Sequence, residues 1–166
     1  MIQKDRVVVD TNVFSYRMQD SPLGERFRSI LAATHACLTV ITLEELLFGA
    51  EKAGWGKKRR ESLDALIADH ELLPATEDTA RVSARIRAER ERQGRPLSRP
   101  DAWIAARALC NGLPLVSHDR DVRGISGLRV YILSDFGFEE SKAPFHTTPK
   151  SGRVTGGAIE IHDRAA

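Results

Sequence analysis

The sequence predicts an α/β fold in which helices cover both faces of a parallel β-sheet. Short apolar runs rich in β-branched residues alternate with longer segments of helical periodicity, which is the pattern of βαβ units. A length of 166 residues suits one domain with one core. A content of 42% hydrophobic and 29% charged residues is typical of soluble globular proteins.

Five short apolar segments are expected to form the strands. The first covers residues 6–10, where three consecutive valines favour a buried strand that ends on Asp10. The other four cover residues 36–41, 70–73, 114–117 and 129–133.

The segments between these strands have helical periodicity and recognisable ends. Helices are expected over residues 22–33, 43–53, 57–68, 77–93 and 100–111. Gly54 and Gly56 mark the break before the third helix, Gly94 ends the fourth, and Gly112 ends the alanine-rich fifth.

The composition changes after residue 138. We expect one folded domain over residues 1–138 and a C-terminal tail over residues 139–166. The tail offers little apolar area and is rich in Gly, Ser and Thr, so it should be disordered or dock on an edge strand or a partner.

Several features predict a cytoplasmic protein that does not enter a membrane. No apolar run approaches the roughly 20 residues that span a bilayer, and the first residues lack the apolar core of a signal peptide. Cys37 and Cys110 are far apart, and each lies in an apolar segment, which favours buried reduced thiols over a disulfide.

The net charge of +2 permits a polyanionic partner without requiring one. Two basic groups are either solvated helix faces or surfaces that contact phosphates. One is residues 57–60, and the other consists of Arg81, Arg85, Arg87, Arg90 and Arg92.

Four acids are expected at one edge of the sheet. Ligands of open parallel sheets bind outside the carboxyl ends of the strands, so residues that follow strands are candidates. Asp10 ends the first strand, and Asp119 lies two residues beyond the end of the fourth, Ser117. Glu45 should lie in the first turn of the helix after the second strand, and Asp101 in the opening turn of the alanine-rich helix.

Each acid also has a local explanation. Thr42 with Glu45 and Ser98 with Asp101 have the spacing of capping boxes, and Asp10 could begin an Asx-turn. Asp119 could be an ordinary loop residue. These roles do not explain why four acids share one edge, where unneutralised carboxylates repel and raise each other's pKa values.

A divalent cation would remove the repulsion. Carboxylate ligands without a cluster of three His or of Cys favour Mg²⁺ or Mn²⁺ over zinc. One or two such ions suit phosphodiester hydrolysis, because they orient and deprotonate the attacking water. Dinucleotide-binding, P-loop, HExxH and G-x-S-x-G motifs are absent from the sequence.

Four motifs together resemble the PIN domain family, and within it the VapC-type toxins of bacterial toxin–antitoxin pairs. They are "VVVDTNVF", "ITLEELLFGAEKAG", "RPDAWIAARAL" and "LPLVSHDRDV", in this order. The resemblance covers residues 7–133. It implies a three-layer α/β/α fold with a five-stranded parallel sheet of order 3-2-1-4-5.

The resemblance also implies a metal-dependent endoribonuclease. The family's metal-binding acids fall on Asp10, Glu45 and Asp101, and its less constant fourth acid falls on Asp119. Glu45 is favoured over Glu44 because the residues that follow it match the family pattern. Positions that support the acids from behind fall on Thr11, Asn12 and Ser117.

The fourth ligand remains open between Asp119, Asp121 and His118. His118 could alternatively touch the scissile phosphate or simply be exposed. Trp103 is either packing at the edge of the core or a platform for a base, and Trp55 is either a local hydrophobic clasp or part of a surface that meets RNA or protein.

The resemblance further implies an RNA substrate, a cognate antitoxin and a homodimer. The antitoxin would lie along residues 13–18, 23–30 and 46–53. Phe14, Phe27 and Phe48 would be contacts there, or else core residues.

Two rival functions remain. One is a PIN-like RNA- or protein-binding module without catalysis, which an apolar residue in place of an acid would mark, and no such replacement is seen. The other is a phospho-acceptor domain using Asp10, but the paired acids and downstream lysine that this requires are absent.

Overall fold

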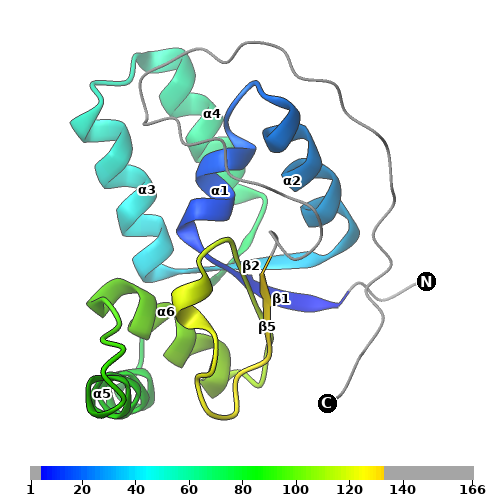
Figure 1. Ribbon diagram of the computed structural model, residues 1–166. Coiled ribbons are helices and arrows are strands. Elements are labelled where there is room, and N and C mark those ends of the chain that lie inside the picture. The colour runs from blue at the N-terminus through cyan, green and yellow to red at the C-terminus, as the bar shows by residue number, and fades with distance from the viewer. Residues whose placement is uncertain (1–4, 133–166) are drawn as a thin grey trace.

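The computed structural model describes residues 5–132, which form a five-stranded parallel sheet with helices on both faces (Figure 1). The strand order is β3-β2-β1-β4-β5, which confirms the fold class and the sheet order. The expected tail, residues 139–166, and the last residues of the expected domain, 133–138, lie outside the described residues.

All five expected strands are present, each slightly shorter than expected. They are β1 (Arg6–Val9), β2 (His35–Thr39), β3 (Glu71–Leu73), β4 (Leu115–Ser117) and β5 (Val130–Ile132).

The five expected helices are also present, together with two elements that the sequence pattern did not reveal. Helix α1 (Thr11–Arg17) is too short to show a periodicity, and the 3₁₀ helix η1 (Arg120–Val122) is a single turn. The expected helices are α2 (Pro22–Ala33), α3 (Val40–Lys52), α4 (Lys57–Ala68), α5 (Glu77–Arg92) and α6 (Arg99–Cys110). No helix among the described residues is long and apolar enough to cross a membrane.

Helix α3 begins three residues earlier than expected. The hydroxyl of Thr39 accepts a hydrogen bond from the Thr42 amide at 3.1 Å, so Thr39 and not Thr42 is the N-cap. Val40 and Ile41 are therefore helical, although their β-branched side chains suggested a longer strand. The expected placement of Glu45 in the first turn, and its capping box with Thr42, are wrong, because Glu45 lies in the second turn.

The valines of β1 divide the core between the two faces of the sheet. Val7 and Val9 pack with core residues of α1 to α4, while Val8 packs with core residues of α5 and α6. Figure 1 shows these two groups of helices on opposite faces of the sheet. Ala102, Ala105 and Ala106 are fully buried, so α6 approaches the sheet closely, as its small residues predict.

Neither cysteine forms a disulfide in the described part of the chain. Cys37 is buried, as expected, but Cys110 is exposed. It is the last residue of α6, beyond the alanine face that packs on the sheet.

Replacing Leu38 with Ala should lower the free energy of unfolding by about 2–5 kcal/mol, because a fully buried side chain of β2 leaves a cavity. Leu72→Ala removes the same atoms from a side chain that is 43% exposed, and should cost less than about 1 kcal/mol. Urea denaturation of both variants measures the difference. Equal costs would contradict the assignment of Leu38 to the core.

Candidate active site

Four acids come from four segments at the carboxyl end of the sheet. Asp10 follows β1, and Asp119 lies two residues after β4. Glu45 lies in α3, which directly follows β2, and Asp101 lies in the first turn of α6. Strands β1 and β4 pair in parallel through Val9 and Val116, so the segments that follow them lie side by side.

Asp10 is buried, with 4% of its surface exposed, and its carboxylate is held by groups from both neighbouring segments. Its Oδ1 accepts a hydrogen bond from the Thr11 amide at 2.7 Å, which caps α1. Its Oδ2 accepts one from the Ser117 hydroxyl at 2.6 Å and a longer one from the side-chain Nδ2 of Asn12 at 3.5 Å. The three residues expected to support the acids thus surround this site.

Glu45 reaches the same region from α3. Its carboxylate accepts a hydrogen bond from the Thr11 hydroxyl, so Thr11 contacts two of the acids, Asp10 through its amide and Glu45 through its side chain. Glu45 is half-buried, whereas its neighbour Glu44 is exposed. Glu45 thus shares its hydrogen-bonding partner Thr11 with Asp10, and the choice of Glu45 over Glu44 as a ligand stays a prediction.

Asp101 is positioned by the beginning of α6. The Ser98 hydroxyl is the N-cap, accepting a hydrogen bond from the Asp101 amide at 3.2 Å, and it also donates to the Asp101 carboxylate. Ser98 and Asp101 therefore do interact as their spacing suggested. This cap fixes Asp101 at the end of the helix that faces the other acids.

The segment after β4 carries Asp119 and Asp121. The Asp119 amide donates to the Ser117 hydroxyl at 3.0 Å, and its carboxylate accepts from the Asp121 amide at 2.8 Å, which caps η1. The buried guanidinium of Arg90 donates to the carbonyl oxygens of Asp121 at 2.7 Å and Arg123 at 3.1 Å. Arg90 thus fixes this loop and is not part of a solvated basic face.

Burial and neighbouring negative charges raise the pKa values of three of the acids. Burial raises the pKa of Asp10 to about 6, against the hydrogen bond from Ser117, and the negative charges of Asp101 and Glu45 add to the rise. The pKa of Glu45 is raised by burial and by Asp101 and Glu44. The pKa of Asp101 is raised by burial and by Asp119 and Asp121. Each carboxylate is therefore ionised at a cost that a cation would remove.

The donor set consists of carboxylate oxygens, which suits Mg²⁺ or Mn²⁺. In the described residues, no three of the acids bring carboxylate oxygens within 4.8 Å of one another. Glu45 and Asp101 instead hydrogen bond to the Thr11 and Ser98 hydroxyls. The residue types and their mutual repulsion fit a cation.

His118 has a role that sequence reasoning missed. Its ring is half-buried and meets the rings of Tyr16 and Phe27 edge to face, with centroids 5.5 Å and 6.1 Å away. Its backbone amide donates to the Asn12 side chain at 3.3 Å. His118 therefore packs the segment that follows β4 against α1 and α2, and it is not simply exposed.

The aromatic residues considered as contacts for a partner divide into buried and exposed ones. Phe14 and Phe27 are fully buried and belong to the core, whereas Phe48 is 58% exposed on α3. Trp55 packs against the core, and the Arg59 guanidinium lies 3.7 Å from the centre of its ring. Trp55 is therefore a hydrophobic clasp between α3 and α4, covered by a cation.

Some residues of the two expected basic groups form ion pairs with nearby carboxylates. Arg60 pairs with Glu51, and Arg81 pairs with Glu77. Lys57, Lys58 and Arg59 are exposed at the start of α4.

Comparison with known proteins supports the expected membership in the PIN domain family. The PIN domain family model matches residues 7–128. The chain is 30% identical over 125 residues to the tRNA(fMet)-specific endonuclease VapC of Shigella flexneri, covering 75% of this chain and 95% of that protein. It is 34% identical over 122 residues to ribonuclease VapC5 of Mycobacterium tuberculosis, covering 72% and 87%.

Solved structures agree with these relatives. The DNA-bound VapBC of Salmonella typhimurium has a TM-score of 0.67 and 30% identity, covering 77% of this chain and 98% of that chain. FitAcB from Neisseria gonorrhoeae has a TM-score of 0.67 and 28% identity, covering 75% and 96%.

Replacing Asp10 with Asn should stabilise the metal-free protein above about pH 6. Because the pKa of Asp10 rises from 3.8 in the unfolded chain to about 6, the unfolded state releases its proton first, and the free energy of unfolding falls as the pH rises between these values. The full difference is roughly 3 kcal/mol. Asn remains a good N-cap for α1.

Denaturation with a chelator at pH 4 and pH 8 measures this effect, and Asp20→Asn at an exposed position is the control. The gain should be large only at pH 8 and only for Asp10→Asn. A variant less stable than the parent at pH 8 would show that the Asp10 carboxylate is stabilising without a cation.

Proposed function

The chain belongs to the PIN domain family and to its VapC group, and we propose that it is a metal-dependent endoribonuclease that acts as the toxin of a toxin–antitoxin pair. The observation that carries the proposal is the meeting of buried and half-buried acids from separate segments, with pKa values raised by burial and by neighbouring negative charges. The relatives named as ribonucleases support RNA as the substrate.

Asp10, Glu45 and Asp101 would hold Mg²⁺ or Mn²⁺, with Asp119 as the fourth acid. When bound, such a cation supplies the activation of a water and the neutralisation of charge on the phosphate. The chain's own residues orient the acids: Ser117 and the Thr11 amide fix Asp10, the Thr11 hydroxyl holds Glu45, and Ser98 holds Asp101. A rigid strand end keeps Asp10 at a fixed position.

The exposed cations at the start of α4 would help to hold the RNA backbone. Lys57 and Lys58 are exposed, and the Arg59 guanidinium covers the ring of Trp55. Contacts of this kind bind phosphate without reading sequence.

The purified chain should cleave RNA with Mg²⁺ or Mn²⁺ and not with a chelator, and Asp101→Asn should lower the rate by at least about a hundredfold, because a cation ligand is lost. Glu89→Gln, a carboxylate of α5 outside the acid cluster, is the matched control and should cleave at the parent rate. Gel analysis of total RNA measures both. Cleavage by Asp101→Asn at the parent rate would show that the site is misassigned, and no cleavage by the folded parent would favour a binding module.

The proposed partner is a cognate antitoxin. Two solved relatives at 30% identity are VapBC of Salmonella typhimurium and VapBC-5 of Mycobacterium tuberculosis, a member of the VapBC family of toxin–antitoxin systems. Leu47 and Phe48 on α3 are exposed at 42% and 58%, and would pack against that partner. We also propose a homodimer and a cytoplasmic location, where the RNA substrate and reduced thiols are found.

Expression of the chain alone should arrest bacterial growth, and Asp101→Asn should relieve the arrest, because toxicity requires cleavage. Phe48→Ser should remain toxic but be neutralised less well by co-expressed antitoxin. Growth curves at matched protein levels measure both effects. Arrest by Asp101→Asn equal to that of the parent would separate toxicity from the proposed site.

A further inference from the structure

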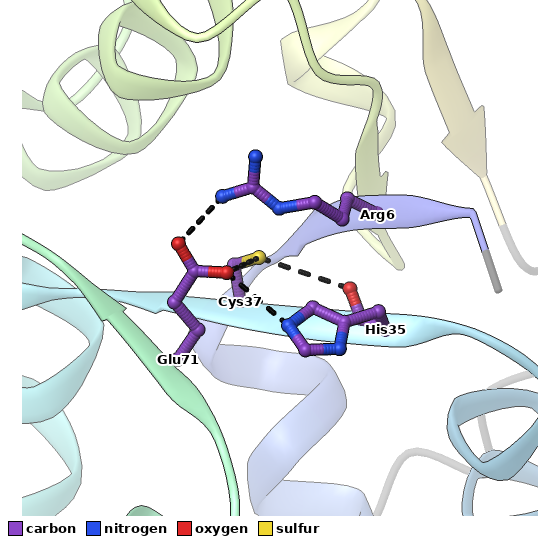
Figure 2. Close-up of polar contacts among 4 residues, drawn as sticks. All are labelled: Arg6, His35, Cys37 and Glu71. Carbon is purple, nitrogen blue, oxygen red and sulfur yellow. Dashed lines mark hydrogen bonds and ion pairs between the residues drawn. The ribbon is translucent and has the colours of Figure 1, made fainter. Parts of the chain in front are cut away.

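A second group of side chains that could bind a metal lies toward the amino-terminal ends of the strands. His35 and Cys37 belong to β2, and Glu71 is the first residue of β3. Figure 2 shows their side chains converging, with Arg6 of β1 beside them. The acids described above follow the strands, so they lie toward the other end of β1 and β2.

Strand geometry explains why these side chains meet. His35 and Cys37 are two residues apart, so they project from the same face of β2. Cys37 is paired in register with Glu71, and His35 with Arg6, which places all four side chains on one face. The positions are therefore fixed by backbone pairing and not by flexible loops.

The donor atoms are spaced like ligands of one ion. The His35 Nε2 atom lies 3.2 Å from Glu71 Oε2, and the Cys37 Sγ atom lies 3.7 Å from the same oxygen. One donor atom from each residue lies within 4.8 Å of the other two. In a tetrahedral zinc site with Zn–S near 2.3 Å and Zn–N near 2.0 Å, neighbouring donors are roughly 3.5 Å apart.

We propose that His35, Cys37 and Glu71 bind a zinc ion at the amino-terminal edge of the sheet. A thiolate, an imidazole and a carboxylate form a donor set that zinc prefers, in contrast to the oxygen donors at the other edge. These three donors leave the fourth position of the ion to water. The Cys37 thiol gives up its proton to solvent as the metal–sulfur bond forms.

Arg6 orients the carboxylate for this role. Its guanidinium Nη2 lies 2.5 Å from Glu71 Oε1, so this oxygen is occupied while Oε2 faces His35 and Cys37. A ligand carboxylate held by a second partner is a common arrangement in metal sites. The ion would join β3, a three-residue strand at the edge of the sheet, to β2.

Cobalt titration of the full chain tests the proposal, because Co²⁺ replaces zinc in such sites and a thiolate ligand gives a near-ultraviolet charge-transfer band. The sequence contains two cysteines, and the exposed Cys110 provides the matched control. The parent, Cys110→Ser and Asp10→Asn should show the band, and Cys37→Ser should lose it. Binding of Co²⁺ by the acids or by other histidines does not produce a thiolate band.

His35→Asn and Glu71→Gln keep the proposal testable if Cys37→Ser fails to fold, since both side chains are partly exposed. Loss of even a supporting partner costs about 10–100-fold in metal affinity, so each variant should weaken cobalt binding at least ~tenfold. A parent protein without the band, or a Cys37→Ser variant that keeps it, would overturn the proposal.

Discussion

Asp10 keeps a carboxylate at the buried end of β1, where the charged groups that act on it most strongly are other carboxylates. Hydrogen bonds from Thr11 and Ser117 hold this carboxylate but do not neutralise it, and its pKa rises to about 6. A protein that keeps such a group forgoes stability, which is expected where a site serves a ligand. The arrangement of the neighbouring segments follows from this requirement.

Strand pairing brings together two different groups of side chains, one at each end of the strands. The pairing of β1 with β4 places Ser117 against Asp10, and Arg90 fixes the loop that carries Asp119. At the other edge, the pairing of β2 with β3 places Cys37 against Glu71. Oxygen donors thus gather where the strands end, and mixed nitrogen, sulfur and oxygen donors gather where they begin, so the two edges suit different cations.

Much of the fold and of the acid cluster could be predicted from sequence, because both depend on local patterns. The valine run that predicts β1 and the alanine face that predicts α6 are each visible within a few neighbouring residues of the sequence. Asp10 directly follows β1, and Asp101 lies in the first turn of α6. Glu45 lies on α3 near Thr11 although this helix starts earlier than expected, because a shift of one helix end does not move the residue off its helix. Its role as a ligand stays a prediction.

What sequence reasoning missed depends on contacts between distant segments. His118 packs on Tyr16 and Phe27, and Arg90 donates hydrogen bonds to backbone carbonyls about thirty residues away in the sequence. No periodic pattern in the sequence indicates either contact. The pairing of Cys37 with Glu71 depends on the register of two strands separated by two helices. Burial of Phe14 and Phe27, in contrast to Phe48, likewise required the packed helices.

The location of bound Mn²⁺ in a crystal tests the central claim most directly, because its anomalous scattering identifies the ion independently of activity. The account predicts Mn²⁺ beside the carboxylates of Asp10, Glu45 and Asp101, and its loss from crystals of the Asp10→Asn protein. Crystals of the folded parent in which Mn²⁺ lies elsewhere, or in which these acids remain without an ion at saturating Mn²⁺, would contradict it.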